Sequence, residues 1–399
     1  MTVSALNSNS AHPTGDRRVV ARVFALTDVG QSREHNEVTF LVANLESGAT
    51  LSFEEGVHEV TADAHGLLFL VADGMGGAAS GELASSMAGQ LVLEGLRESW
   101  SKAATPDVAT FAEALRDATG LANTRIHQHA RENPEHRGMG TTATIAGLFG
   151  DRLFVVQVGD SRAYMVRDGL ARQITKDQSL MQRLVEAGEL TPEEAEVSDR
   201  RNIILQALGP EAQITVDLTH QQLRRGDTLI LCSDGLSGLV RGEEIGALTT
   251  TEPDVRLVCR KLVDRANARG GPDNITVIAV QFEGDALVAS TATDSVGYTA
   301  YPLEGTLYDQ TREMPTSRPP RNTIKSDPTP RQGVRMPTRS EQREADAAQR
   351  NIDDKASVVA PLPEPAIAER KRAVQPLFML LGSVAVAALV WTAMQLLRR

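Results

Sequence analysis

The chain has 399 residues, of which 41% are hydrophobic and 23% are charged, and its formal net charge is −11. This length and composition are typical of one large or two ordinary soluble domains. The acidic balance argues against nucleic acid as a partner, because a phosphate backbone binds to basic surfaces. Two cysteines far apart in sequence, Cys232 and Cys259, argue against a disulfide framework or a zinc site and favour a reducing compartment.

The first residues, 1–18, contain neither an apolar core nor a cleavage site, so they predict a disordered N-terminus without a secretory signal. Strand-like and helix-like segments then alternate over residues 19–283, which we interpret as one folded domain. Apolar runs predict strands at 19–26, 38–43, 67–72, 141–149, 152–158, 162–167, 227–233 and 275–282. Amphipathic spacing predicts helices at 80–98, 107–131 and 253–269. Several strands are joined by turns too short for a helical crossover, so the predicted fold class is α+β with antiparallel pairing.

The composition changes after residue 283. Residues 284–375 are rich in Pro, Ser, Thr and Arg and lack apolar periodicity, which predicts a disordered linker. Residues 376–397 then form an apolar segment in which 377–397 carry no charge and basic residues lie on both sides. Such a segment is long enough to cross a bilayer as a helix. We therefore expect a single-pass C-terminal anchor in the cell membrane, with the domain on the cytoplasmic side; a buried core helix is the alternative.

Carboxylates stand where several of the predicted strands begin or end. The run "LLFLVA" leads directly into Asp73 and a glycine-rich turn, Asp160 and Asp234 follow other strands, and Asp273 precedes the last one. A single Asp-Gly pair is most simply a turn. Several such positions, together with Arg33 and Glu37 in the early stretch "DVGQSREHNEV", indicate one shared site.

Converging carboxylates repel one another and need cations to stay ionised together. Oxygen ligands without a cluster of His or Cys favour Mg²⁺ or Mn²⁺ over zinc. Two such ions that share a carboxylate lower the pKa of water and favour its attack on phosphorus. The pattern therefore predicts a two-metal hydrolase.

The residues that form this pattern also resemble a known family, the metal-dependent type 2C (PPM) Ser/Thr protein phosphatases in their bacterial form. The matching motifs stand in the family's order: "DVGQSREHNE" (28–37), "VADGMGG" (71–77), "GMGTTAT" (138–144), "VGDSRAY" (158–164), "SDGLSG" (233–238) and "GPDNITVI" (271–278). The resemblance implies a central antiparallel β-sandwich flanked by helices in α-β-β-α layers, with a two-metal centre at one end. It also implies hydrolysis of phosphoserine and phosphothreonine without a phosphoenzyme intermediate.

The resemblance further assigns roles to individual residues. It implies that Asp73 bridges both ions, that the carbonyl of Gly74 and the side chain of Glu37 bind one of them, and that Asp234 and Asp273 hold the other. It implies a third, weaker ion at Asp160.

The same resemblance makes Arg33 the phosphate-binding residue, because its planar fork suits bidentate contact with phosphate oxygens. Residues 176–209 resemble the mobile flap that bacterial members place beside the cleft. The expected partners are phosphorylated proteins, among them Ser/Thr kinases and their targets at the membrane.

The chain departs from the family pattern at several positions. Val38 stands where an acid usually follows Glu37, and Gly238 stands where some members carry another acid. Met75 replaces a histidine that serves animal members as a proton donor, and Gln178 stands where a histidine is usual. These departures motivate an alternative hypothesis: a membrane-tethered pseudophosphatase that binds phosphoproteins or a kinase with little turnover.

Overall fold

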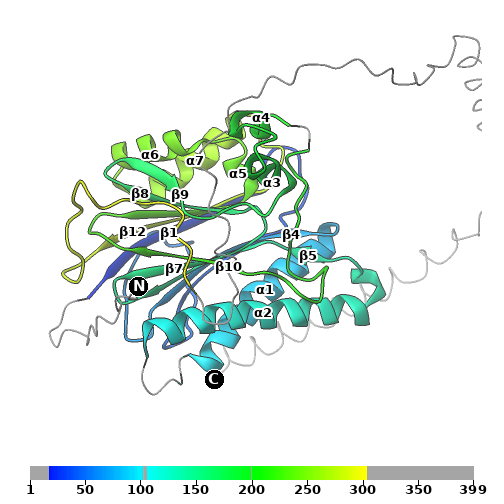
Figure 1. Cartoon of the computed structure of the whole chain (residues 1–399), viewed down its shortest axis with the longest axis horizontal. Coiled ribbons are helices and arrows are strands. Elements are labelled where there is room, and N and C mark those ends of the chain that lie inside the picture. The colour runs from blue at the N-terminus through cyan, green and yellow to red at the C-terminus, as the bar shows by residue number, and fades with distance from the viewer. Residues whose placement is uncertain (1–17, 101, 103–105, 199, 303–399) are drawn as a thin grey trace, which may run out of the picture. The chain divides into compact units, whose positions relative to one another are not determined.

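The computed structural model describes residues 18–100, 102, 106–198 and 200–302, and within them two antiparallel sheets pack face to face (Figure 1). The first sheet has the strand order β3 (His58–Thr61), β1 (Val20–Asp28), β12 (Ile275–Glu283), β11 (Thr228–Cys232), β8 (Arg162–Arg167) and β9 (Leu170–Gln173). The second sheet has the order β10 (Asp217–Gln222), β7 (Arg152–Val158), β6 (Ala143–Phe149), β4 (Leu67–Met75) and β2 (Val38–Asn44). A short strand, β5 (Gly140–Thr141), pairs with the end of β4.

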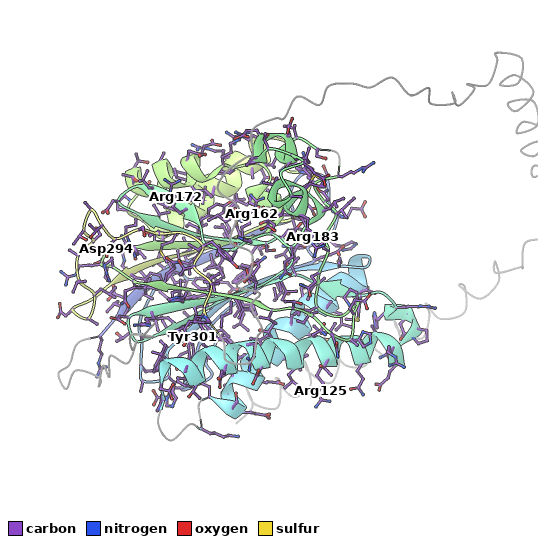
Figure 2. The ribbon with its side chains drawn as sticks, in the orientation of Figure 1. Arg125, Arg162, Arg172, Arg183, Asp294 and Tyr301 are labelled. Atoms are coloured by element: carbon purple, nitrogen blue, oxygen red, sulfur yellow. The ribbon has the colours of Figure 1, made fainter. Side chains whose placement is uncertain are left out.

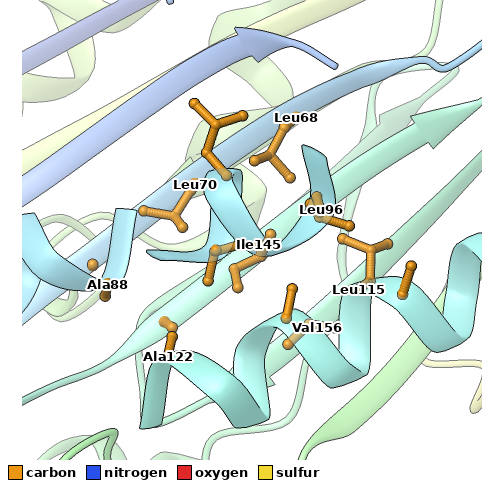
Figure 3. Packing of buried hydrophobic residues seen from close by; sticks show 14 of the residues in the cluster. Leu68, Leu70, Ala88, Leu96, Leu115, Ala122, Ile145 and Val156 are labelled. Carbon is orange, nitrogen blue, oxygen red and sulfur yellow. The ribbon is translucent and has the colours of Figure 1, made fainter. Parts of the chain in front are cut away.

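Helices cover the outer faces of both sheets (Figure 1). Two long helices, α1 (Ala78–Ser99) and α2 (Val108–Glu132), pack on the second sheet, and Figure 3 shows their apolar side chains against those of β4, β6 and β7. The first sheet is covered by α5 (Asp234–Ser237), α6 (Gly242–Thr251) and α7 (Val255–Ala268). The predicted α+β class, with antiparallel sheets and flanking helices, is confirmed.

The layered arrangement explains the continuous apolar runs in the sequence. Strands β4 and β6 have a helix layer on one face and the other sheet on the other face. Every residue of β6 is buried, as are the first six residues of β4, so neither strand alternates between apolar and polar residues.

Some elements differ from those predicted. The run expected as one strand at 141–149 is divided at Thr142, between β5 and β6. The strand is divided because Thr142 forms two hydrogen bonds with the backbone of Asp73. The Thr142 backbone N–H donates to the carbonyl of Asp73 (2.8 Å), and the Thr142 hydroxyl accepts from the Asp73 N–H (3.0 Å). The break therefore fixes the backbone of Asp73 at the end of β4.

The predicted boundary between domain and linker lies too early. Residues 284–302, which we call the strap, continue from β12 and contact the second sheet, although the composition predicted a disordered linker from Gly284. Leu287 is buried, and Val296 packs against the core between the sheets. A few apolar and aromatic residues are sufficient here because the exposed edge of β10 supplies backbone hydrogen-bond partners.

In the part of the chain that the structure describes, no helix combines the length and the apolar character needed to cross a membrane. The anchor predicted at 376–397 lies outside the described residues, as do residues 1–17 and the linker from 303 onward.

Candidate metal centre

Both sheets contribute strand ends to one end of the sandwich. In the second sheet, β4 reaches Asp73 opposite Val38, the first residue of β2. In the first sheet, β11 ends beside the beginning of β12, so that Asp234 and Asp273 lie at the same end of that sheet. The fold therefore brings together carboxylates that are far apart in sequence.

Close backbone packing holds the two loops of the first sheet against each other. A Cβ atom on Gly235 would lie 2.2 Å from the carbonyl oxygen of Asn274, and one on Gly30 would lie 2.2 Å from that of Asp273. Neither position tolerates a side chain without a backbone shift, so the glycines beside these aspartates permit the approach of the loops.

Asn274 organises the loop that carries Arg33 and Glu37. Its side chain is buried, its Oδ1 accepts from the backbone N–H of Glu37 (2.9 Å), and its Nδ2 donates to the carbonyls of Val29 (3.0 Å) and His35 (2.9 Å). The sequence analysis assigned no role to Asn274. Its only signal was its position directly after Asp273 at the start of a buried strand.

Glu37 and Gly74 meet the first turn of α1. The backbone N–H of Gly74 donates to the carbonyl of Glu37 (3.1 Å), and a Cβ atom on Gly81 would lie 2.1 Å from Oε2 of Glu37. Gly81 thus leaves the space that the carboxylate of Glu37 occupies. This contact places Glu37 next to the carbonyl-bearing turn after Asp73.

Asp160 lies in the turn between β7 and β8 and is buried, with 7% of its surface exposed. Gly159 adopts a φ of 102°, which favours glycine, and its carbonyl accepts from the backbone N–H of Gln178 (2.8 Å). Arg162, two residues after Asp160, forms a charge-assisted pair with Asp177, with 2.7 Å between Nη2 and Oδ2. The turn that carries Asp160 is therefore fixed by residues of the 176–209 segment.

The carboxylates influence one another strongly. Removal from water is the first cause that raises the pKa of Asp73 well above its usual range, followed by the charges of Asp234, Asp273 and Asp160. Removal from water, followed by the charge of Asp273, also raises the pKa of Asp234. Burial, with the charges of Asp234 and Asp177, raises the pKa of Asp160 to about 8. Without a cation, the group cannot hold all of its negative charges at neutral pH.

Arg33 faces the same carboxylates from the more exposed side. Its Nη2 lies 2.7 Å from Oδ2 of Asp273, and about half of its side chain is exposed. The hydrogen bond to Asp273 raises the pKa of Arg33 most, and the charges of Asp273, Glu37 and Asp73 raise it further. The guanidinium is therefore within electrostatic reach of the carboxylates from both sheets.

The structure places the residues that the sequence analysis assigned to the site at one end of the sandwich, where the carboxylates lie within electrostatic reach of Asp73 or Arg33. The donors are oxygen atoms only, from carboxylates and from the backbone at Gly74, and such a set fits hard divalent ions such as Mg²⁺ and Mn²⁺. Mutual repulsion among the carboxylates is what bound cations would relieve. The individual ligand roles remain predictions.

Among the described residues, the one acidic or histidine trio whose ligand-type atoms all lie within 4.8 Å of one another is Glu46, Asp63 and His65, and the carboxylates of the candidate centre are not that close together. The carboxylate of Asp63 already accepts from Asn44 Nδ2 and from the backbone N–H groups of His65 and Gly66. These bonds show that Asp63 stabilises the turn before β4.

A sequence model of the protein phosphatase 2C family matches residues 56–275. The chain belongs to this family. A serine/threonine phosphatase, stp, of Listeria monocytogenes is 32% identical over 255 residues, which cover 64% of this chain and 93% of that protein. PstP of Mycobacterium tuberculosis, a serine/threonine protein phosphatase, is 41% identical over 212 residues, which cover 53% of this chain and 39% of that protein.

Solved structures of bacterial serine/threonine phosphatases are similar to the fold described above. The crystal structure of Mycobacterium tuberculosis PstP/Ppp is 36% identical, covers 66% of this chain and 99% of that one, and has a TM-score of 0.54. The catalytic domain of PstP in complex with two manganese ions is 35% identical, with a TM-score of 0.53 and coverage of 66% and 99%. The resemblance noted in the sequence is therefore confirmed at the level of the family.

Proposed function

We propose that this chain is a metal-dependent protein phosphatase that hydrolyses phosphoserine and phosphothreonine on proteins with two Mn²⁺ or Mg²⁺ ions. The observation that carries the proposal is the convergence of Asp73, Asp234 and Asp273 from both sheets beside an exposed arginine, Arg33. The relatives named serine/threonine phosphatases and the two manganese ions bound to the PstP catalytic domain support it.

Two ions bound at this site would lower the pKa of water and neutralise charge on the phosphoryl oxygens. The side chain of Asp73 lies among the other carboxylates, which suits a ligand shared by both ions. Glu37 and the carbonyl of Gly74 would hold one ion, and Asp234 and Asp273 the other. Asp160 would hold a third, weaker ion.

Arg33 would orient the substrate's phosphate group. Its guanidinium now pairs with Asp273, and both side chains are partly exposed, 49% and 31%. An ion pair in contact with water is worth little, so exchange of Asp273 for a phosphate dianion costs little free energy. The planar fork can then bind two phosphate oxygens at once.

Two departures from the family pattern have structural accounts. Val38 is buried in the core between the sheets, opposite Asp73, so it packs as an apolar residue rather than contacting water at the site. Gln178 bonds to the Gly159 turn through its side chain and its backbone. Val38 replaces an acid of the family pattern, but Glu37, Asp73, Asp234 and Asp273 are all present, and this favours the enzyme over a pseudophosphatase.

The test uses the full chain purified in detergent and freed of metal. With Mn²⁺ added, we expect release of phosphate from p-nitrophenyl phosphate and from a phosphothreonine peptide, and complete loss of activity with EDTA. A folded chain that binds the phosphopeptide but releases no phosphate at millimolar Mn²⁺ would instead support the pseudophosphatase.

We further propose that residues 376–397 anchor the chain in the cell membrane with the phosphatase domain on the cytoplasmic side. The proposal rests on sequence, since 377–397 carry no charge and Arg370, Lys371 and Arg372 precede the segment. Substrates would then be phosphoproteins at the membrane, including kinases and their targets. Recovery of the full chain in the membrane fraction, and of a chain lacking 376–399 in the supernatant, is the expected result.

A further inference from the structure

The strap (residues 284–302) follows a defined path over the domain. In Figure 1 it is the yellow segment after β12, and Figure 2 labels Asp294 and Tyr301 along it. Asp294 pairs with Arg224 at 2.7 Å, and farther along the strap forms a short antiparallel contact with β10. There His220 N–H donates to the carbonyl of Thr299 (3.0 Å), and Tyr301 N–H donates to that of Leu218 (2.8 Å). The strap thus adds to the edge of the second sheet.

Tyr298 connects the strap to the beginning of the flap (residues 176–209). Its hydroxyl donates to Oδ1 of Asp217 at 2.8 Å, and Nζ of Lys176 lies 4.4 Å from the centre of its ring. Lys176 also pairs with Glu186 at 3.3 Å, at the end of α3 (Leu180–Glu186). One aromatic side chain therefore contacts both β10 and the first residue of the flap.

The first residues of the flap contact the turn that carries Asp160. After Lys176, Asp177 pairs with the partly buried Arg162. The side-chain Oε1 of Gln178 accepts from the backbone N–H of Gly159 (3.0 Å), while its backbone N–H donates to the Gly159 carbonyl (2.8 Å). Asp177 and Gln178 therefore fix the turn next to the candidate metal centre without any contribution from Lys176.

The last residues of the flap pair with β5, which lies beside the end of β4. Leu208 and Thr141 exchange backbone hydrogen bonds of 2.8 and 3.0 Å, and the Thr141 hydroxyl donates to the carbonyl of Asp73 (2.9 Å). Both ends of the flap are thus attached to backbone that positions carboxylates. Between them, the flap leaves three apolar side chains substantially exposed: Val197 (74%), Ile203 (42%) and Leu205 (46%).

We propose that Tyr298 is a positioning residue, through which the strap holds the flap in the orientation that receives a protein substrate. The strap acts on the flap through Lys176, and the flap presents its exposed side chains to residues flanking the phosphorylated one. A small phosphate ester does not reach those side chains, so it does not depend on the strap. This inference rests on the proposed phosphatase function.

The test compares full-length variants in steady-state kinetics. Tyr298→Leu removes the hydroxyl and the ring, and Tyr298→Phe removes the hydroxyl but keeps the ring beneath Lys176. Ser290→Ala is the matched control, because Ser290 also lies in the strap but bonds to Asp168, which is outside the flap. We expect Tyr298→Leu to raise the KM for a phosphothreonine protein about fivefold, the size of a lost cation–π contact and hydrogen bond. Its kcat and its KM for p-nitrophenyl phosphate should not change, Tyr298→Phe should be intermediate, and Ser290→Ala should match the wild type.

A second readout is independent of activity. Arg200 and Arg201 are exposed on the flap, so trypsin cleavage after them, followed by mass spectrometry, reports how often the flap opens. We expect faster cleavage in Tyr298→Leu and an unchanged rate in Ser290→Ala. Lys176→Met gives the same comparison from the flap side if Tyr298→Leu does not fold.

The outcomes separate this inference from the proposed function. An unchanged cleavage rate and an unchanged protein-substrate KM in Tyr298→Leu would overturn it, as would an equal loss with both substrates, which indicates a general structural role. A wild-type chain without activity on either substrate would refute the proposed function, while the cleavage rates would still decide whether the strap holds the flap.

Discussion

The carboxyl groups of Asp73 and Asp234 lie within hydrogen-bonding reach of each other, although Asp73 ends a strand of the second sheet and Asp234 follows a strand of the first. A hydrogen bond between them requires that one carboxyl group carry a proton. Asp73 is the better candidate, because the bond raises its pKa and lowers that of Asp234. In the metal-free protein, this proton reduces the repulsion between the two carboxylates, as a bound cation would.

Asp73→Asn should therefore have opposite effects on stability and activity. Phosphate release should fall at least about a hundredfold, as expected when a group that supports the reacting charges is removed. The metal-free variant should be more stable than the metal-free wild type by about 1–2 kcal/mol, because the amide is neutral without the uptake of a proton that the buried Asp73 requires at neutral pH. Denaturant unfolding in EDTA measures the second effect. A variant less stable than the wild type in EDTA would contradict the electrostatic account of the site.

The stability of the metal-free protein should depend on pH through Asp160. Because its folded pKa is raised to about 8, the folded state binds more protons than the unfolded state between an unfolded pKa of about 4 and that value. The unfolding free energy in EDTA should therefore fall as the pH rises from about 5 to about 8. Asp160→Asn should flatten this dependence, and saturating Mn²⁺ should weaken it. An equally steep fall in Asp160→Asn would assign the effect to other groups.

Arg33→Lys should raise the KM for a phosphothreonine peptide about tenfold, although it preserves the charge. The ammonium group lacks the planar fork that binds two phosphate oxygens, and a lost charge-assisted hydrogen bond is worth about 1.4 kcal/mol or more. Steady-state kinetics measure the change, and Arg116→Lys on the surface of α2 is the control. Equal KM values for Arg33→Lys and the wild type would remove Arg33 from substrate binding.

Val38→Asp tests whether the apolar residue opposite Asp73 limits metal binding. A second carboxylate buried beside Asp73 should cost the metal-free protein about 2 kcal/mol or more. The Mn²⁺ concentration for half-maximal activity should fall, because the added charge attracts the cation. Val38→Asn, which has the same shape without the charge, should lower stability but not that concentration. The same response from both variants would mean that shape rather than charge matters.

The sequence was most informative where a residue had a single plausible structural explanation. Asp73 was found because a fully buried strand ended on a carboxylate, and the order of the motifs indicated the family. The motifs could not show that Asn274 ties the Arg33 loop to β12, since an asparagine beside an aspartate is also common in turns. That role depends on contacts between residues 29–37 and 274, which no local pattern encodes.

The strap was missed for a related reason. Its sequence lacks the apolar periodicity of a helix or strand, and it was interpreted together with the Pro-, Ser-, Thr- and Arg-rich residues that follow it, whose composition predicts disorder. Its contacts depend on partners from distant segments, such as Arg224 for Asp294 and the open edge of β10 for residues 299–301. Tertiary partners of this kind become visible only when the fold is known.

The central claim is that the acidic residues of both sheets hold a pair of divalent ions. Calorimetric titration of Mn²⁺ into the metal-free full chain, with phosphate release measured on the same samples, tests it most directly. We predict two tightly bound Mn²⁺ ions per chain, with activity that rises as they bind, and no tight binding in Asp73→Asn. A folded wild-type chain that binds no Mn²⁺, or that hydrolyses the phosphothreonine peptide equally well in EDTA, would contradict the claim.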